Sequence, residues 1–155
     1  MEKIFIIMTA AFCVFFTGCS NRFAEEQYSD VSAIAAEDRY AETGFTKTTT
    51  YNEIHVKAKS FNGRETLMTN TNPNEAFDIT AVTSFSLSEG TAKLVLIDDG
   101  NVSTVAECSA ENSAQLIETR ITIPKGEGVF KLVGHGCKNV DVLMTLDYDS
   151  TGVKQ

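Results

Sequence analysis

The sequence contains no tryptophan, only two prolines and only two histidines. A sugar-binding surface usually offers flat aromatic rings, so the lack of tryptophan weakens a carbohydrate hypothesis and leaves it to tyrosines such as Tyr51 and Tyr148. Short enzyme motifs are missing as well: there is no Gly-x-Ser-x-Gly, no His-Glu-x-x-His, no phosphate-binding glycine-rich loop and no Cys-x-x-Cys. The sequence therefore gives no direct sign of catalysis.

Basic residues are also scarce, with 13 Lys and Arg against 21 Asp and Glu and a formal net charge of −8. Such a chain repels phosphate backbones, so nucleic acid is not an expected partner. The segment 98–101, Asp-Asp-Gly-Asn, lacks the alternating acidic spacing of a calcium loop and is more typical of a hairpin turn. His55 has Lys57 and Lys59 on the same face of its expected strand, which favours a surface role over metal ligation. We expect no cofactor and no metal ion.

One long apolar run is present, at the amino terminus. It extends from Ile4 to Phe16, is broken only by Thr9 and follows Lys3. This arrangement is typical of a signal peptide. As a helix the run would reach only about 20 Å, short of the roughly 30 Å hydrocarbon core of a bilayer, so it is expected to be a cleaved leader and not a permanent span.

The run ends in Phe16-Thr17-Gly18-Cys19, which resembles the lipobox of bacterial lipoproteins. Phe16 departs from the aliphatic residue that this family more often has there. The resemblance implies cleavage between Gly18 and Cys19, a diacylglyceryl thioether on Cys19, and often a further acyl chain such as palmitate on the new amino group. Two or three chains hold a protein stably on a bilayer, whereas one holds it only marginally. The alternative is an ordinary secretory leader followed by an incidental cysteine.

The lipobox resemblance also implies a location and a domain organisation. Family members without aspartate after the lipidated cysteine are usually sent to the outer membrane, and this position is Ser20. We therefore expect a lipid-anchored protein facing away from the cytoplasm, on the outer membrane if the organism has one. Residues 1–18 form the leader, 19–44 the lipidated cysteine and a tether, and 45–155 one β domain. The tether is rich in Ala, Glu, Asp and Ser, which favours a flexible spacer over a short docked helix.

The cysteines suggest a disulfide. Cys13 lies in the leader and Cys19 would carry lipid, which leaves Cys108 and Cys137. Two cysteines in an exported domain favour a bridge, and closing this loop would stabilise the fold by about 3 to 4 kcal/mol. Two inert buried thiols are the alternative. A catalytic thiol at Cys137, activated by His135 on the same face, is a third and weaker hypothesis.

From about Thr46 to Asp149 apolar residues recur with a period of two and are separated by turn residues. Asn62-Gly63 and Asp99-Gly100 are typical of hairpin turns. About eight short strands predict an all-β fold, an antiparallel β-sandwich or jelly roll, with a closed barrel as the alternative. The clearest of the expected strands cover 54–59, 77–87, 92–97, 102–106, 117–123, 129–133 and 140–148.

Two short segments near the carboxyl terminus carry a weaker resemblance. Residues 123–134 and 140–144 are similar to the last strands of small β-sandwich domains carried by many uncharacterised lipoproteins. The similarity agrees with the expected fold and implies no function.

These observations favour a non-enzymatic envelope lipoprotein that binds another envelope protein or a glycan, with 46–59 as an open edge for contact. The alternative is a small hydrolase or metal-dependent enzyme whose site is assembled from distant residues, with His55, His135, Asp141 and Asp147 as candidates. A spacer with no soluble ligand is a third possibility.

Overall fold

The computed structural model describes residue 25 and residues 28–148. The leader, Gly18 and Cys19 lie outside the described residues. Within the described part of the chain, no helix has both the length and the apolar character required to cross a membrane.

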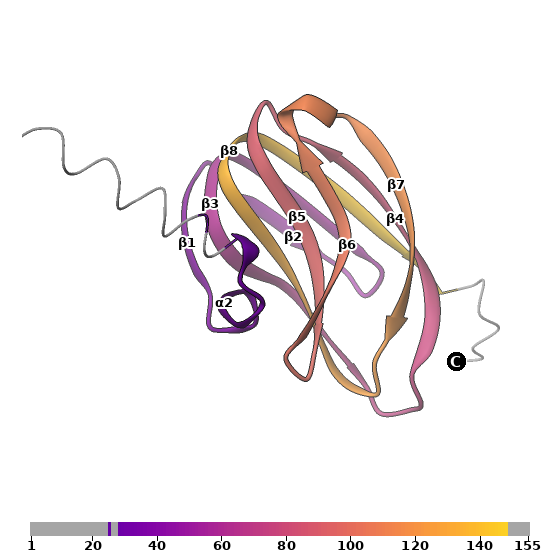
Figure 1. Ribbon diagram of the computed structural model, residues 1–155. Helices are drawn as coiled ribbons and strands as arrows, with labels where there is room; N and C mark the ends of the chain where they lie inside the picture. The colour runs from indigo at the N-terminus through magenta and orange to yellow at the C-terminus, as the bar shows by residue number, and fades with distance from the viewer. Residues whose placement is uncertain (1–24, 26–27, 149–155) are drawn as a thin grey trace, which may run out of the picture.

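The described chain folds into one antiparallel sheet of eight strands, preceded by a short helix (Figure 1). The predicted all-β antiparallel fold is confirmed. The elements are α2 (Val31–Ala35), β1 (Arg39–Thr43), β2 (Thr46–Thr49), β3 (Glu53–Asn72), β4 (Phe77–Ser86), β5 (Glu89–Asp98), β6 (Asn101–Ser109), the 3₁₀ helix η1 (Ala110–Asn112), β7 (Gln115–Ile123) and β8 (Gly126–Asp147).

The sheet is organised around two long strands, β3 and β8, which pair with each other from one end to the other. Residues 128–138 of β8 pair with β5 on their second side, and residues 141–147 pair with β4. The sheet therefore folds across β3 and β8 into two layers. The first layer has the order β1-β3-β8-β5-β6 and the second has the order β2-β3-β8-β4-β7.

The bend in β3 lies where the sequence suggested a hairpin turn at Asn62-Gly63, and that prediction is wrong. The β3–β8 register shifts between Phe61 and Gly63, and the strand continues to Asn72. Gly63 has a φ of +117°, in the region that glycine alone adopts readily. A left-handed glycine suits a β-bulge as well as a two-residue turn, and here it bends one strand across two layers.

The bend in β8 corrects a second expectation. The separate strands expected at 129–133 and 140–148 are parts of β8, and the glycine-rich segment between them is a bend within that strand. The turn expected at Asp99-Gly100 is confirmed, with φ of 46° and 80° between β5 and β6. The chain also reverses after Pro124, as expected.

The core lies between the two layers. The alternation expected along 77–87 is confirmed, since the side chains of β4 that face inward are buried and their neighbours are partly or fully exposed. The largest side chains with almost no exposed surface come from both layers: Phe61, Phe85, Phe130, Ile54, Ile79, Leu94, Ile123, Leu132, Met144 and Leu146. Burial of this apolar surface is the main force that holds the layers together.

Gly63 gives the first testable prediction. A Cβ atom at Gly63 would lie 2.1 Å from the carbonyl oxygen of Arg39, because β1 crosses the bend there. Gly63→Ala should lower the free energy of unfolding by about 3 kcal/mol, from backbone strain and this collision together. Gly100→Ala is the control: its φ is also positive but nothing lies within 4 Å, so a loss of about 1 kcal/mol is expected. Equal losses in urea denaturation would contradict the packing of β1 on the bend.

Candidate functional site

The amino-terminal arm, which we define as residues 28–38, is docked on the domain. Asp30 caps α2 by accepting hydrogen bonds from the backbone N–H groups of Ser32 (2.8 Å) and Ala33 (3.2 Å). Ile34 has no exposed surface, because it packs on the outer face of the first layer in a small apolar cluster. The members of that cluster from the sheet are Val95, Ile97 and Val133, flanked by Val102 and Val129.

The structure thus differs from the expected tether over residues 28–43. These residues form a docked arm and the strand β1, so the folded part begins well before residue 45. The physical reason is that β5 is apolar on both faces. Its inner face belongs to the core, and its outer face needs a cover that α2 supplies.

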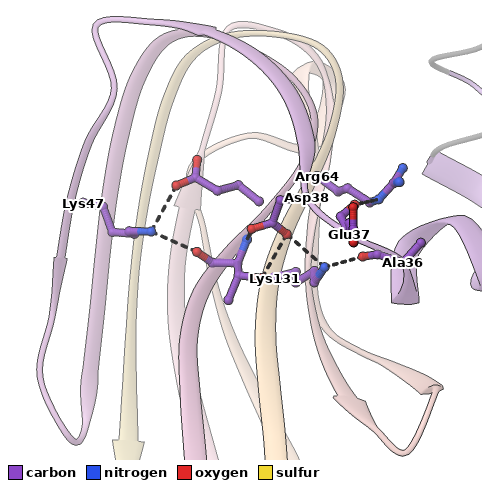
Figure 2. A network of polar contacts seen from close by, with 8 residues as sticks. Ala36, Glu37, Asp38, Lys47, Arg64 and Lys131 are labelled. Carbon is purple, nitrogen blue, oxygen red and sulfur yellow. Dashed lines mark hydrogen bonds and ion pairs between the residues drawn. The ribbon is translucent and has the colours of Figure 1, made fainter.

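A buried lysine fixes the end of this arm (Figure 2). The side chain of Lys131 is 6% exposed, and its ammonium group forms an ion pair with Asp38 (2.9 Å) and donates a hydrogen bond to the carbonyl oxygen of Ala36 (2.7 Å). Thr66 also donates to Asp38 through its backbone N–H and its hydroxyl, both at 2.9 Å. Burial alone would raise the pKa of Asp38, but the hydrogen bonds from Lys131 and Thr66 hold it below its ordinary value.

Figure 2 shows two further polar side chains, Arg64 and Lys47, that connect the arm and the edge strand β2 to β3. Arg64 is largely buried, and its Nε donates to the carbonyl oxygen of Glu37 at 2.8 Å. Lys47 reaches from β2 in the second layer to the buried carboxylate of Glu65 in the first layer (3.0 Å) and to the carbonyl oxygen of Thr66 (2.9 Å). The arm and the edge strand are therefore held by contacts in which one charged partner, Lys131, Arg64 or Glu65, is buried, and burial strengthens such contacts.

The described arm begins at Tyr28. Its hydroxyl donates to the carboxylate of Glu107, and the ammonium group of Lys93 lies 4.6 Å from the centre of its ring. Burial, and then the hydrogen bond to Glu107, raise the pKa of Tyr28 above its ordinary value. Because Lys93 lies opposite Val133, beside the bend of β8, the arm begins on the outer face of the first layer near the bend.

An aromatic cluster occupies the opposite end of the sandwich, and we call it the aromatic end. Tyr51, in the turn between β2 and β3, is 75% exposed, and its ring centre lies 6.3 Å from that of Tyr148 with an angle of 33° between the ring planes. The ring of Phe77 lies 6.2 Å from Tyr148. The amide of Asn70 donates to the Tyr148 hydroxyl at 3.0 Å. Burial raises the pKa of Tyr148, so its hydroxyl stays protonated over a wide pH range.

A shallow depression of about 310 Å³ lies at the bend. Phe61 and Cys137 are buried residues that line it, and on its rim the hydroxyl groups of Thr43 and Ser60 share a hydrogen bond of 2.7 Å. Lys138, also on the rim, forms an ion pair with Glu89 (2.7 Å). Its lining contains no histidine and one carboxylate, so it offers no evident acid and base pair. The lining residues are Ala41, Glu42, Thr43, Ser60, Phe61, Asn62, Gly136, Cys137 and Lys138.

The structure does not bring the two histidines together. His55 lies on the outer face of the second layer, where Asp141 contacts both His55 (3.1 Å) and Lys57 (2.8 Å). His135 lies at the bend of β8, opposite Thr91 of β5. Within residues 28–148, no group of three His, Cys, Asp or Glu side chains could hold a metal ion. The arrangement therefore gives the hydrolase or metalloenzyme hypothesis no support.

The fourth residue of that hypothesis, Asp147, lies opposite Thr80 at the end of β8. Burial alone would raise the pKa of Asp141, but hydrogen bonds from Lys57 and His55 hold it below its ordinary value. A carboxylate that stays charged in an exposed ion pair is an ordinary feature of a strand surface.

The predicted disulfide is wrong: Cys108 and Cys137 are both free and buried in the core. Their thiols donate to backbone carbonyl oxygens, Cys108 to Phe85 (3.6 Å) and Cys137 to Thr91 (2.9 Å). Burial raises the pKa of Cys137 to about 11, so the thiolate that a nucleophile requires is scarce. A disulfide was expected because the domain is exported, but export alone does not fix where the two side chains lie. In the structure both cysteines pack in the core as small apolar side chains.

The predicted contact edge, 46–59, is only partly an edge. β2 does lie at the edge, but residues 53–59 belong to β3, which is covered by β2 on one side and β8 on the other. On the β3 side of the sandwich the edge strands are β1 and β2, which both pair with β3 and whose residues are all exposed. The sequence did not separate β2 from β3 and did not predict β1, because both edge strands are short and lack an alternating apolar pattern.

Comparison with known proteins gives few matches. No protein-family model matches the chain, and no curated protein matches it. Among solved structures, a CBM35 from Paenibacillus barcinonensis is 13% identical, with 74% of this chain and all of that chain covered and a TM-score of 0.35. A family 35 carbohydrate binding module from an environmental isolate is 17% identical, with 72% and 77% covered and a TM-score of 0.36. At these TM-scores the similarity assigns no ligand to this chain.

The buried ion pair gives the second prediction. Lys131→Met keeps most of the apolar stem but removes the cationic partner of Asp38 and the hydrogen-bond donor to the carbonyl oxygen of Ala36, so the free energy of unfolding should fall by about 2 kcal/mol. Lys125→Met is the matched control, because Lys125 forms an exposed ion pair with Glu75 (3.3 Å), and its loss should be below about 0.5 kcal/mol. Urea denaturation of both variants measures the difference. Similar values for the two would mean that Lys131 does not secure the arm.

The lowered pKa of Asp38 gives the third testable prediction. A carboxyl group whose pKa is lower in the folded state stabilises the fold above its ordinary pKa of 3.8 and loses this effect as the pH falls through the folded value. The wild type should therefore be more stable than Asp38→Asn at neutral pH, and the difference should shrink between about pH 5 and about pH 2. Unfolding free energies measured along this range provide the check. A difference that stays constant with pH would show that the Asp38 charge contributes nothing.

Proposed function

We propose that this chain is a membrane-anchored envelope lipoprotein whose β domain is a non-enzymatic binding module. Cys19 would carry the lipid after cleavage behind Gly18, and the bilayer would be its first partner. The support is the leader and lipobox-like segment, joined to a domain whose candidate catalytic residues lie in separate places. With Ser20 after the cysteine, the outer membrane is the proposed location where the organism has one.

The lipobox-like segment at Cys19 carries this proposal, and the docking of the arm adds an orientation to it. Tyr28 follows Cys19 by only nine residues, and Tyr28 is held by Glu107 and Lys93. A fully extended chain of this length spans at most about 30 Å. An acylated Cys19 would therefore hold the domain close to the bilayer and at the side where the arm begins, near the bend.

The same geometry supports a role for the aromatic end in binding a partner. β3 runs eight residues from Glu53 to the bend at Phe61, which is roughly 25 Å of strand. Since the arm begins near the bend, the aromatic end would face away from the bilayer. There its exposed tyrosine can meet a partner in the envelope, a protein or a glycan.

Acylation of Cys19 gives the fourth prediction. In cells fed labelled palmitate, the wild-type protein should carry label and sediment with membranes, whereas Cys19→Ser should lose the label and appear in the soluble fraction. Cys13→Ser is the matched control. Cys13 lies in the same leader, and its substitution should change neither the labelling nor the sedimentation with membranes. Mass spectrometry of the purified protein checks the site. A bare sulfur on Cys19, or a leader still attached, would rule out the proposed anchor.

A further inference from the structure

The geometry points to the aromatic end as a binding site for the pyranose ring of a neutral glycan, with Tyr51 as the stacking residue. This inference deepens the proposed function and rests on it for the presence of a glycan partner in the envelope. Tyr51 is the reason for this choice. Among the described tyrosines and phenylalanines that contact another ring, its side chain is the most exposed.

The first step is the shape of the surface. The rings of Tyr51 and Tyr148 lie 6.3 Å apart and are tilted by 33°, and Phe77 packs against the other side chain of this pair, Tyr148. Tyr148 and Phe77 are partly buried against the core, whereas Tyr51 is 75% exposed. Tyr148 and Phe77 thus support the site from the protein side, and the ring of Tyr51 offers apolar surface to a ligand.

The second step is rigidity. The turn that carries Tyr51 is fixed on both sides: the backbone N–H of Thr50 donates to the carbonyl oxygen of Glu53 (2.9 Å), and the N–H of Leu146 donates to that of Asn52 (2.8 Å). The Tyr148 hydroxyl is fixed by Asn70. A site whose residues are already ordered loses little conformational entropy when a ligand binds. The aromatic end is therefore preorganised.

The third step is the chemistry. A pyranose ring has an apolar face of C–H groups that packs on an aromatic ring, and hydroxyl groups around its edge that need hydrogen-bonding partners. The aromatic end offers both kinds of contact, since phenol hydroxyls and the amide of Asn70 lie beside the rings. A few aromatic side chains with a few polar groups suit a small ligand. They cover far less than the roughly 800 Å² that each partner contributes to a stable protein interface.

The fourth step is charge. The chain carries a formal net charge of −8. An acidic protein repels anionic polymers, so a glycan without carboxylate, sulfate or phosphate groups is the ligand that fits.

Retention on immobilised glycans tests this inference. Full-length mature protein in detergent is incubated with agarose beads that carry a neutral β-glucan, xylan, galactomannan or dextran, and the bound fraction is measured against protein concentration. We expect retention of the wild type on at least one of these. Tyr51→Ala should weaken it at least tenfold, whereas Tyr51→Phe should preserve most of it because the ring face remains.

Tyr40→Ala is the matched control. Tyr40 is also an exposed tyrosine, at 47%, but it stacks on Phe61 near the bend, far from the aromatic end. It should bind as the wild type does. Because Tyr51 is largely exposed, Tyr51→Ala should unfold at nearly the same urea concentration as the wild type, so weaker retention would not reflect unfolding.

Several outcomes would overturn the site: no retention of the wild type on any bead, equal retention of Tyr51→Ala, or loss with Tyr40→Ala alone. Tyr51-dependent sedimentation with neutral phosphatidylcholine vesicles, without retention on beads, would reassign the ring to lipid and overturn it too. These outcomes are separate from the anchor. Acylated Cys19 with no retention would remove only the glycan site, and Tyr51-dependent retention with a bare Cys19 would remove only the anchor.

Discussion

The bent ladder between β3 and β8 is the constraint on which the rest of the structure depends. Each of the other strands pairs with β3, with β8 or with a strand that does. Gly63 lies opposite Gly134 where the ladder bends, and a Cβ atom at Gly134 would meet the ring of Phe61 at 2.7 Å. Two glycines facing each other let the backbone turn while Phe61 fills the space between the layers. One pair of strands can then serve both layers.

Folding one ladder across two layers leaves outer faces that need cover. On the first layer, Val95 and Val133 face outward and would expose apolar surface if the arm were free. Ile34 covers them, and the chain must leave the helix over Lys131, whose charge would lack a partner without Asp38. Apolar packing and a buried ion pair thus hold the same segment. The arm is part of the fold because both contacts would be lost together.

The sequence predicts those parts of the fold that are encoded locally. Alternation along 77–87 identifies β4, and Asp99-Gly100 identifies a turn, because in each case neighbouring residues carry the whole signal. Gly63 was misread because its conformation suits a turn and a bulge alike. The short docked helix that contains Ile34 was the less favoured alternative to a flexible spacer, because a helix of five residues shows little periodicity. The apolar outer side chains of β5 show that this face must be covered, but they do not show which segment of the chain covers it.

The candidate site is harder to predict for the same reason. Lys131 lies in an apolar run between Phe130 and Leu132. A lysine in such a run indicates that its charge is paired in the folded protein, but the sequence does not identify the partner. Tyr51 and Asn70 both belong to the aromatic end, yet they lie on either side of the bend, so only the fold of β3 brings them together.

That bend also separates the two proposed roles of the domain. It places the start of the arm at one end of the sandwich and Tyr51 at the other, so the proposed attachment to the bilayer would leave the aromatic rings pointing away from it. If the arm were a flexible spacer, the domain could tumble and no surface would be preferred for contact. Because Asp38 and Lys131 fix the arm, the identity of the outward-facing surface follows from the fold once Cys19 carries lipid.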